Sequence, residues 1–186
     1  MKTAKLLVLF SLIAISASPA GAVQMFPQRY DARYILTTGE LPVEIRTSSD
    51  GKGRLRSEAS NGGTNRSITL TDYIGRVVYR ISTSPRMVFK TPLSEPYEGD
   101  FDDAAAKRKN ATSLGRKSIK GRMCLGWTFK QDGVTCEVWV DEKARFLAHS
   151  ESKDQRVISR MELVEANTDE QPEALFEIPY PLPPGA

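Results

Sequence analysis

Apolar and polar side chains alternate along most of the chain beyond residue 29. In the stretch YDARYIL, every second residue is apolar or aromatic, and the residues between are mostly charged. A period of two is typical of a strand with one buried face. A second such stretch, LPVEIRT, follows Gly39-Glu40, and a two-residue turn there would place Leu36 opposite Val43 and Tyr34 opposite Ile45. The pattern therefore predicts a β-hairpin whose apolar rows coincide.

The same alternation returns in further segments, and most links between them have hairpin length. These segments cover residues 54–59, 66–73, 76–83, 86–90, 116–130, 134–140, 144–150 and 155–166. Many consecutive strands with little helix between them favour an antiparallel sheet. The sequence thus predicts a mainly β fold of the α+β kind, in which one antiparallel sheet is strongly curved or partly rolled.

Two segments have helical patterns. In DFDDAAAKRKNATSLG, Asp100 is suited to cap a helix, acidic residues occupy the first turn, and Gly115 is suited to end the helix. This helix has few large apolar residues, so we expect it to rest on the sheet. The stretch QPEALFEI at 171–178 predicts a short helical turn. The sheet is therefore expected to carry one or two covering helices.

The first 22 residues have the composition of a secretory signal peptide. Lys2 and Lys5 precede an uncharged, mostly apolar run, and Ala20-Gly21-Ala22 fits a cleavage site. A transmembrane anchor is the alternative reading, but the run is shorter than the ~20 apolar residues that a spanning helix needs. We expect removal of residues 1–22 from an exported protein, which leaves one domain at 23–180 and a proline-rich tail at 181–186.

Net charge gives little guidance about partners. The formal charge is +3, and loss of the two lysines in the signal peptide lowers it to +1, so nothing suggests nucleic-acid binding. Locally, residues 95–103 are acidic, whereas residues 107–122 carry seven basic residues and no acid. The basic stretch is either a patch for anionic headgroups or an acidic partner, or the end of a helix followed by the solvent face of a strand.

The segment CEVWVDEKARFLAHS contains Cys136 and the only histidine, His149. With a turn at 141–144, these two residues would lie close together on one face. A nucleophilic Cys–His pair also needs an orienting group, and Asp141 would lie in the turn, away from both. The pattern indicates strand, turn and strand, and the sequence has no compact zinc spacing, EF-hand loop or phosphate loop. We therefore predict no catalytic residues, no metal, no cofactor and no enzymatic activity.

Two cysteines in an exported protein favour a disulfide. A two-residue turn at Asp132-Gly133 would place Cys124 and Cys136 on opposite faces of the sheet. A three-residue turn would place them on one face but ~13 Å apart, which is beyond the reach of a disulfide. A longer loop or a bulge at Gly126 would bring them together. The sequence therefore leaves open whether Cys124 and Cys136 form a disulfide.

Three motifs carry a family resemblance. LGRKSIKG follows the predicted helix, a strand ends in Trp-x-Asp before the turn at 141–144, and Leu-Phe-Glu-Ile-Pro occupies 175–179. In this order they resemble the outer-membrane lipoprotein carrier (LolA/LolB-like) superfamily, especially its uncharacterised exported branches, over about residues 30–183.

The resemblance implies an unclosed half-barrel whose concave apolar side is covered by helices. In the carriers, the cavity on that side holds the acyl chains of lipoproteins. The carriers have several lid helices, whereas this chain offers one helix and a short helical turn, and its cysteines lie outside the family pattern. The half-barrel and an apolar cleft therefore carry over as expectations, and lipoprotein delivery does not.

The inward apolar residues of such a half-barrel either line a cleft or pack a core. They are Tyr34, Leu36, Val43, Ile45, Leu70, Val77, Tyr79, Ile81, Phe89, Trp127 and Phe129. We expect an exported, periplasmic envelope protein that binds a lipid, an acyl chain or a lipidated partner.

The alternative is a protein-interaction or envelope-stress sensor module. Such a module would dock its partner through a sheet edge, the basic segment or the proline-rich tail. Peripheral contact with a membrane is compatible with either hypothesis, and the oligomeric state is left open.

Overall fold

The computed structural model describes residues 26–39, 41–62, 66–97, 100–154 and 158–181. The expected signal peptide, and the expected tail beyond Pro181, lie outside these residues. No helix in the described part of the chain is both long enough and apolar enough to cross a membrane.

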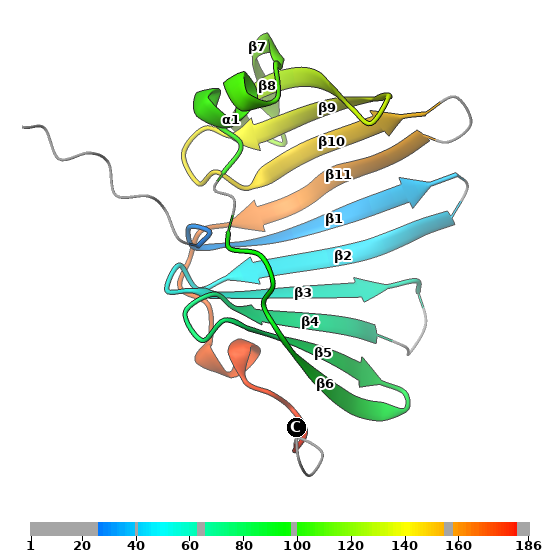
Figure 1. Ribbon diagram of the computed structural model, residues 1–186, viewed down its shortest axis with the longest axis vertical. Helices are drawn as coiled ribbons and strands as arrows, with labels where there is room; N and C mark the ends of the chain where they lie inside the picture. Colours follow the sequence, from blue (N-terminus) through cyan, green and yellow to red (C-terminus); the bar gives the residue numbers. More distant parts are fainter. Residues whose placement is uncertain (1–25, 40, 63–65, 98–99, 155–157, 182–186) are drawn as a thin grey trace, which may run out of the picture.

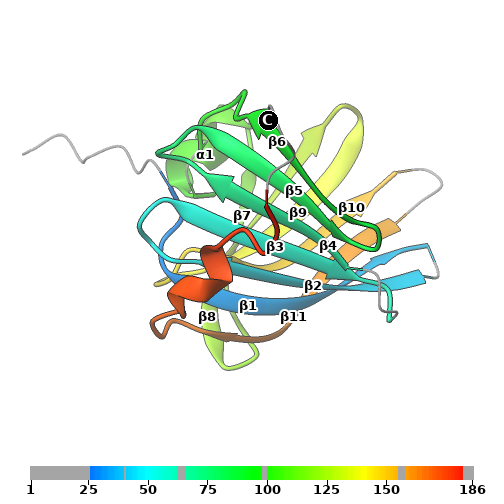
Figure 2. The same ribbon diagram turned by 90° about the horizontal axis from the view of Figure 1, so that it is seen from below.

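A single antiparallel sheet of eleven strands makes up most of the described chain. Its strand order is β6-β5-β4-β3-β2-β1-β11-β10-β9-β8-β7. The strands are β1 (Tyr30–Thr38), β2 (Leu41–Ser49), β3 (Arg54–Ser60), β4 (Arg66–Asp72), β5 (Val77–Thr83), β6 (Arg86–Pro92), β7 (Thr112–Ile119), β8 (Arg122–Gln131), β9 (Val134–Asp141), β10 (Leu147–Lys153) and β11 (Ile158–Asn167). Figures 1 and 2 show that the sheet curves toward one side and stays open between β6 and β7. The predicted curved, unclosed antiparallel sheet is confirmed.

Two meanders build this sheet and meet in its middle. Strands β1 to β6 form one, β7 to β11 form the other, and β1 pairs with β11 at the centre. The described residues of the connection between the meanders, 93–97 and 100–111, cross the concave side between β6 and β7 (Figure 1). The concave side is therefore covered only along the path of this connection.

The predicted first hairpin has the expected register. Leu36 pairs with Val43, and Tyr34 pairs with Ile45. Thr38 pairs with Leu41, so the turn has two residues, and Gly39 adopts a φ of 66°. A positive φ suits glycine because it has no side chain to clash with the backbone.

The helix α1 (Asp103–Arg108) is shorter than its sequence pattern suggests. Asp102, and not Asp100, caps it, because the Asp102 side chain accepts a hydrogen bond from the N–H of Ala105 at 2.8 Å. The helix ends at Arg108, and Gly115 lies within β7 beside an irregularity in the β7–β8 register. Acidic residues at the start and basic residues at the end complement the helix dipole.

The predicted C-terminal helical turn is present as the 3-10 helix η1 (Glu173–Phe176). It lies against the convex side of β3, opposite to α1 (Figure 2). Arg56 on β3 donates to the carbonyl of Leu175 at 3.0 Å, and the Arg54 guanidinium lies 5.2 Å from the centroid of the Phe176 ring. The two covering segments of the sheet thus lie on opposite faces.

Candidate functional site: an apolar row on the concave face

One row of cross-strand partners runs along the concave face over six strands. Directly opposed residues in an antiparallel pair point to the same face. The members of this row are Trp127 (β8), Val138 (β9), Ser150 (β10), Met161 (β11), Leu36 (β1) and Val43 (β2). We call this set the concave row. Five of its six side chains are apolar.

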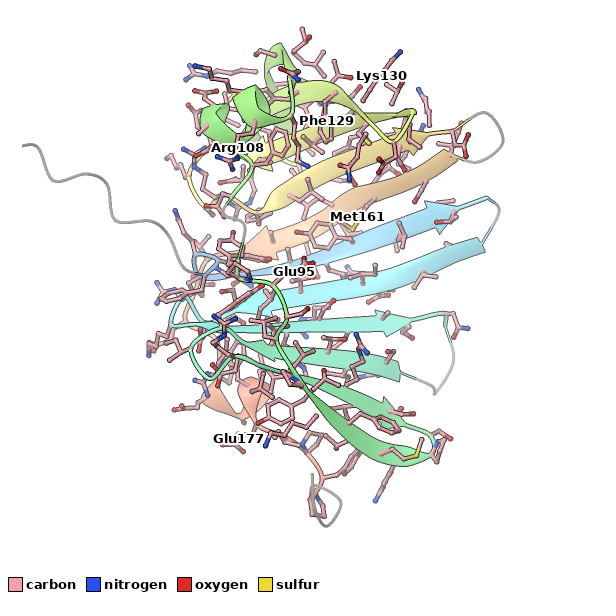
Figure 3. The ribbon with its side chains drawn as sticks, in the orientation of Figure 1. Glu95, Arg108, Phe129, Lys130, Met161 and Glu177 are labelled. Atoms are coloured by element: carbon pink, nitrogen blue, oxygen red, sulfur yellow. The ribbon has the colours of Figure 1, made fainter. Side chains whose placement is uncertain are left out.

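Helix α1 and its preceding residues cover only one end of the concave row. The ring of Phe101 lies 5.3 Å from that of Trp127 and stacks on Phe129 at the same centroid distance. Ala106 packs against Trp127, which is buried. The remaining members of the row are half-buried, and Figure 3 shows Met161 on the uncovered part of the sheet. The row therefore passes from a closed end at β8 to an open stretch over β11, β1 and β2.

The sequence-predicted cleft residues divide between the two faces. Register places seven of them on the concave face: Tyr34, Leu36, Val43, Ile45, Phe89, Trp127 and Phe129. It places the other four on the convex face: Leu70, Val77, Tyr79 and Ile81. The expectation of one shared inward set needs correction for these four.

Strand β3 explains the division. It pairs in register with both neighbours, so Ile45 on β2 is continued across the sheet by Ala59 and then by Ser67. Leu70 instead pairs with Arg56, whose side chain lies on the convex face. The apolar residues of β4 and β5 therefore point away from those of β1 and β2.

The C-terminal segment covers the convex apolar residues. Ile68, Ile81 and Val88 form a buried cluster against which Ile178 and Tyr180 pack. These side chains contribute to the core of this half and are closed to a ligand. The concave face of the same strands is largely polar, with Thr69, Arg80 and Ser82 among its residues.

Sequence reasoning missed two apolar members of the concave row, Val138 and Met161. Both lie at alternating apolar positions, Val138 with Val140 and Met161 with Leu163. The signal was present within each strand. The pairing of β1 with β11, which joins Met161 to Leu36, could not be read from that alternation.

Tyrosine and lysine groups set the electrostatics of the concave face. Burial, and to a smaller extent Tyr30 and Asp31, raises the pKa of Tyr34 far above its ordinary range, so this side chain stays neutral near pH 7. Lys109 lies 5.5 Å from the centroid of the Phe129 ring, at the α1 end. The open stretch between Met161 and Val43 is thus uncharged, with a cation at its closed end.

The structure contains both cysteines as free thiols. Phe129 pairs with Cys136, as a two-residue turn at Asp132-Gly133 requires, and Cys124 pairs with Asp141. Cys124 and Cys136 therefore lie on opposite faces, and the disulfide that the sequence left open is not formed. The irregularity that was considered at Gly126 lies in β7 instead, between Ser113 and Gly115.

Cys136 and His149 also lie on opposite faces. The loop after β9 extends to Phe146, and the β9–β10 register shifts between Leu147 and His149. His149 consequently pairs with Trp139, whereas Cys136 pairs with Ser152. The expected proximity of this thiol and imidazole is wrong, and the pair has no geometry for nucleophilic catalysis. Among the described residues, no group of three or more His, Cys, Asp or Glu side chains could hold a metal ion.

Comparisons with known proteins bear on the fold. No protein-family model matches the sequence, and no curated protein sequence matches it. The solved structure of MucB matches with a TM-score of 0.55 and 13% identity, covering 83% of this chain and 58% of MucB. The complex of Pseudomonas aeruginosa MucA and MucB matches with a TM-score of 0.52 and 13% identity, covering 81% of this chain and 55% of the other.

This chain therefore spans little more than half the length of the MucB chains that it matches. The LolA superfamily protein NE2245 from Nitrosomonas europaea also matches, at a TM-score of 0.40 and 13% identity, covering 83% of this chain and 93% of NE2245. The chain has a fold similar to that of MucB. At such identities the likeness describes the fold alone, and function must be argued from the face itself.

Proposed function

We propose that this protein is a non-enzymatic, exported envelope protein that holds an acyl chain, a lipid or a lipidated partner along the concave row. The observation that carries the proposal is the uncovered, uncharged stretch from Met161 to Val43. A hydrophobic ligand that covers half-buried apolar side chains on a concave surface removes them from water, and this burial lowers the free energy of the complex.

The dimensions of the row support an extended ligand. Val138 and Val43 lie four strand spacings apart, which is about 19 Å at about 4.8 Å per spacing. Each methylene buried there contributes about 0.8 kcal/mol. Ser150 interrupts the row once, so a ligand with a mostly apolar chain fits it better than a compact polar molecule.

Native mass spectrometry of the protein purified from its own envelope tests this proposal. We expect a bound species of lipid mass that organic solvent releases. The double variant Leu36→Gln, Met161→Gln should carry at least tenfold less of it. Tyr79→Gln is the matched control, because Tyr79 is also half-buried but points to the convex face, outside the concave row. Equal loading of the double variant and the wild-type protein would contradict the proposal.

A second candidate function is a protein-interaction module. The edge strand β6 presents Phe89 and Met87 on the concave side with 55% and 41% of their surfaces exposed. Such an edge can accept an added strand from a partner. MucB, which has a similar fold, has been solved in complex with MucA. Under this alternative, a protein copurifies in place of lipid, and Phe89→Glu abolishes its capture while Leu36→Gln leaves it unchanged.

A further inference from the structure

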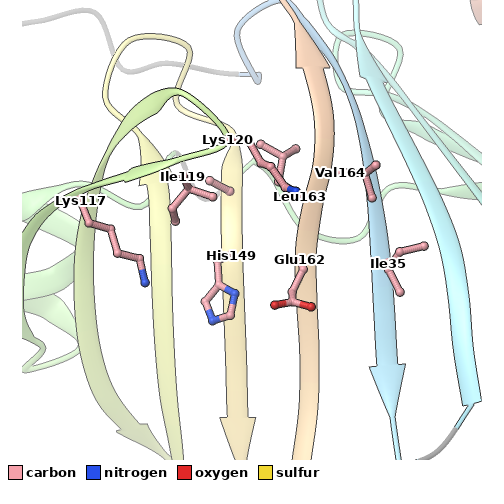
Figure 4. A pocket seen from close by; sticks show the side chains of 9 residues that line it. Ile35, Lys117, Ile119, Lys120, His149, Glu162, Leu163 and Val164 are labelled. Atoms are coloured by element: carbon pink, nitrogen blue, oxygen red, sulfur yellow. The ribbon is translucent and has the colours of Figure 1, made fainter.

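A separate pocket lies on the convex face, under the tip of the β7–β8 hairpin (Figure 4). Its volume is about 470 Å³, which is within the range of small-molecule sites. Ile35, Ile119, Leu163 and Val164 give it an apolar lining from three strands, β1, β7 and β11. The hairpin curls over β10 and β11, so the pocket is bounded by two layers of the same sheet.

Four polar side chains also line this pocket: Lys117, Lys120, His149 and Glu162. The Lys117 ammonium lies 3.9 Å from the centroid of the Trp139 ring, and this cation–π contact holds it beside the pocket. His149 and Glu162 are cross-strand partners. Figure 4 shows the side chains of Lys117, His149 and Glu162 directed into one common space. The pocket thus combines an apolar lining with convergent polar groups.

The charge of the lining discriminates among ligands. Burial and the nearby Lys117 lower the pKa of His149, and together they outweigh the opposite effects of Glu137, Glu162 and Glu151. His149 is therefore mostly neutral near pH 7. Two lysines and one glutamate then leave a single net positive charge. A monoanion balances that charge, whereas a multiply charged anion would meet the carboxylate of Glu162.

We propose that this pocket binds a free monoanionic amphiphile of the fatty-acid type, with its carboxylate beside Lys117 and Lys120 and its hydrocarbon chain on the apolar lining. The site is on the opposite face from the concave row, so it does not depend on the function proposed above. It gives the protein two ligand sites of different chemistry, one charged and one uncharged.

Titration of the purified protein with octanoate, followed by methyl and amide NMR shifts, tests the proposal. We expect saturable shifts at Ile35 and Val164 and at least tenfold weaker effects from 1-octanol and from inorganic phosphate. If octanol bound as tightly as octanoate, the carboxylate charge would contribute nothing to affinity, and the proposed role of the lysines would be wrong. If phosphate bound as tightly as octanoate, the hydrocarbon chain would contribute nothing to affinity. If octanoate caused no shifts at Ile35 and Val164, the proposal that this pocket binds it would be wrong.

Charge variants sharpen the test in both directions. Lys117→Gln and Lys120→Gln should each weaken octanoate binding at least fivefold, while Lys90→Gln on the distant strand β6 should leave it unchanged. Glu162→Gln should strengthen binding a few-fold, because it removes a like charge. A misfolded variant cannot gain affinity, so a gain would support the assignment directly. Weaker binding by a Glu162→Gln variant that keeps the native amide NMR spectrum would contradict it.

The same titration separates this site from the concave row. In the Leu36→Gln, Met161→Gln variant, octanoate should still shift Ile35 and Val164 with unchanged affinity. Parallel loss at both sets of residues would mean that octanoate has one site on the concave face, and the convex-pocket proposal would fail.

Discussion

The two halves of the sheet present rows of apolar side chains on opposite faces. In the half around β1, β2 and β8 to β11, Leu36, Met161 and Trp127 point to the concave side. In the half made of β4 to β6, Ile68, Ile81 and Val88 point to the convex side and form a core under the C-terminal segment. The second half is therefore filled, whereas the first retains an apolar surface that its cover reaches only at one end.

Each half also closes its convex face in its own way. The β4–β6 half uses η1 and the residues after it, with Phe176 only 4% exposed. The β8–β9 half uses Trp139, which lies across Gly126 and beneath Lys117. Outside the pocket under the β7–β8 hairpin, both halves thus cover apolar residues of their convex face, and the concave row remains as an open apolar surface on the other face.

The largest expected effect comes from a pair of phenylalanines. Phe176→Ala should lower the free energy of unfolding by about 3 kcal/mol, because it empties a buried position that holds the C-terminal segment. Phe89→Ala on the exposed edge of β6 should cost less than about 1 kcal/mol. Urea unfolding followed by circular dichroism measures both. Equal costs would show that the C-terminal segment does not contribute to the core of this half.

The contact between Gly126 and Trp139 is the next test. A Cβ at Gly126 would lie 2.5 Å from a ring carbon of Trp139, so Gly126→Ala must displace the ring and should cost about 1–3 kcal/mol. The near-ultraviolet circular dichroism of Trp139 should change with it. Ser118→Ala on the exposed strand β7 is the control, and an unaltered spectrum in Gly126→Ala would refute the close packing.

Asp50 lies at the boundary between the halves, before β3. Burial alone would raise the pKa of Asp50, but hydrogen bonds from Arg54 and from the N–H of Lys52 outweigh it, so the pKa lies below the ordinary value of 3.8. The folded pKa is the lower one, so its contribution is complete above the unfolded pKa and is lost as the pH falls through the folded value. Asp50→Asn should cost about 1–2 kcal/mol at pH 7 and flatten the decline in stability below pH 4. An equally steep decline in the variant would contradict this role.

The smallest effect is expected at Leu36, and Leu70 on the opposite face gives the contrast. Leu36→Ala should cost less than about 1 kcal/mol because this side chain is half-buried. Leu70→Ala, at a position with 3% exposure, should cost about 2–4 kcal/mol. The same urea titrations measure both costs. If Leu36→Ala cost as much as Leu70→Ala, the concave row would be part of the buried core and could not contact a ligand.

The sequence predicted the strands well because alternation is a local property. The register of Tyr34 with Ile45 and of Phe129 with Cys136 followed from two-residue turns. Alternation does not say which face of the sheet a strand presents, so Leu70 and Ile81 were grouped with Leu36. That choice depends on which distant segment covers each face, here the C-terminal residues after β11.

The sequence also could not predict strand register where two strands are joined by more than a tight turn. The loop after β9 is longer than its Asp-Glu-Lys-Ala stretch suggested, and the irregularity before His149 moves it to the face opposite Cys136. Helix α1 is short because the residues of the predicted helical segment from Thr112 onward belong to the edge strand β7. In each case, long-range strand pairing overrides the local pattern.

The most direct test of the concave row is paramagnetic NMR with an uncharged, spin-labelled fatty-acid ester, whose lack of charge disfavours the convex pocket. The account predicts selective broadening of the methyl signals of Leu36, Val43 and Met161, with those of Ile35 and Leu70 unaffected. Broadening confined to the convex methyl groups, or none at saturating ester, would contradict the central claim that the concave face holds a hydrophobic ligand.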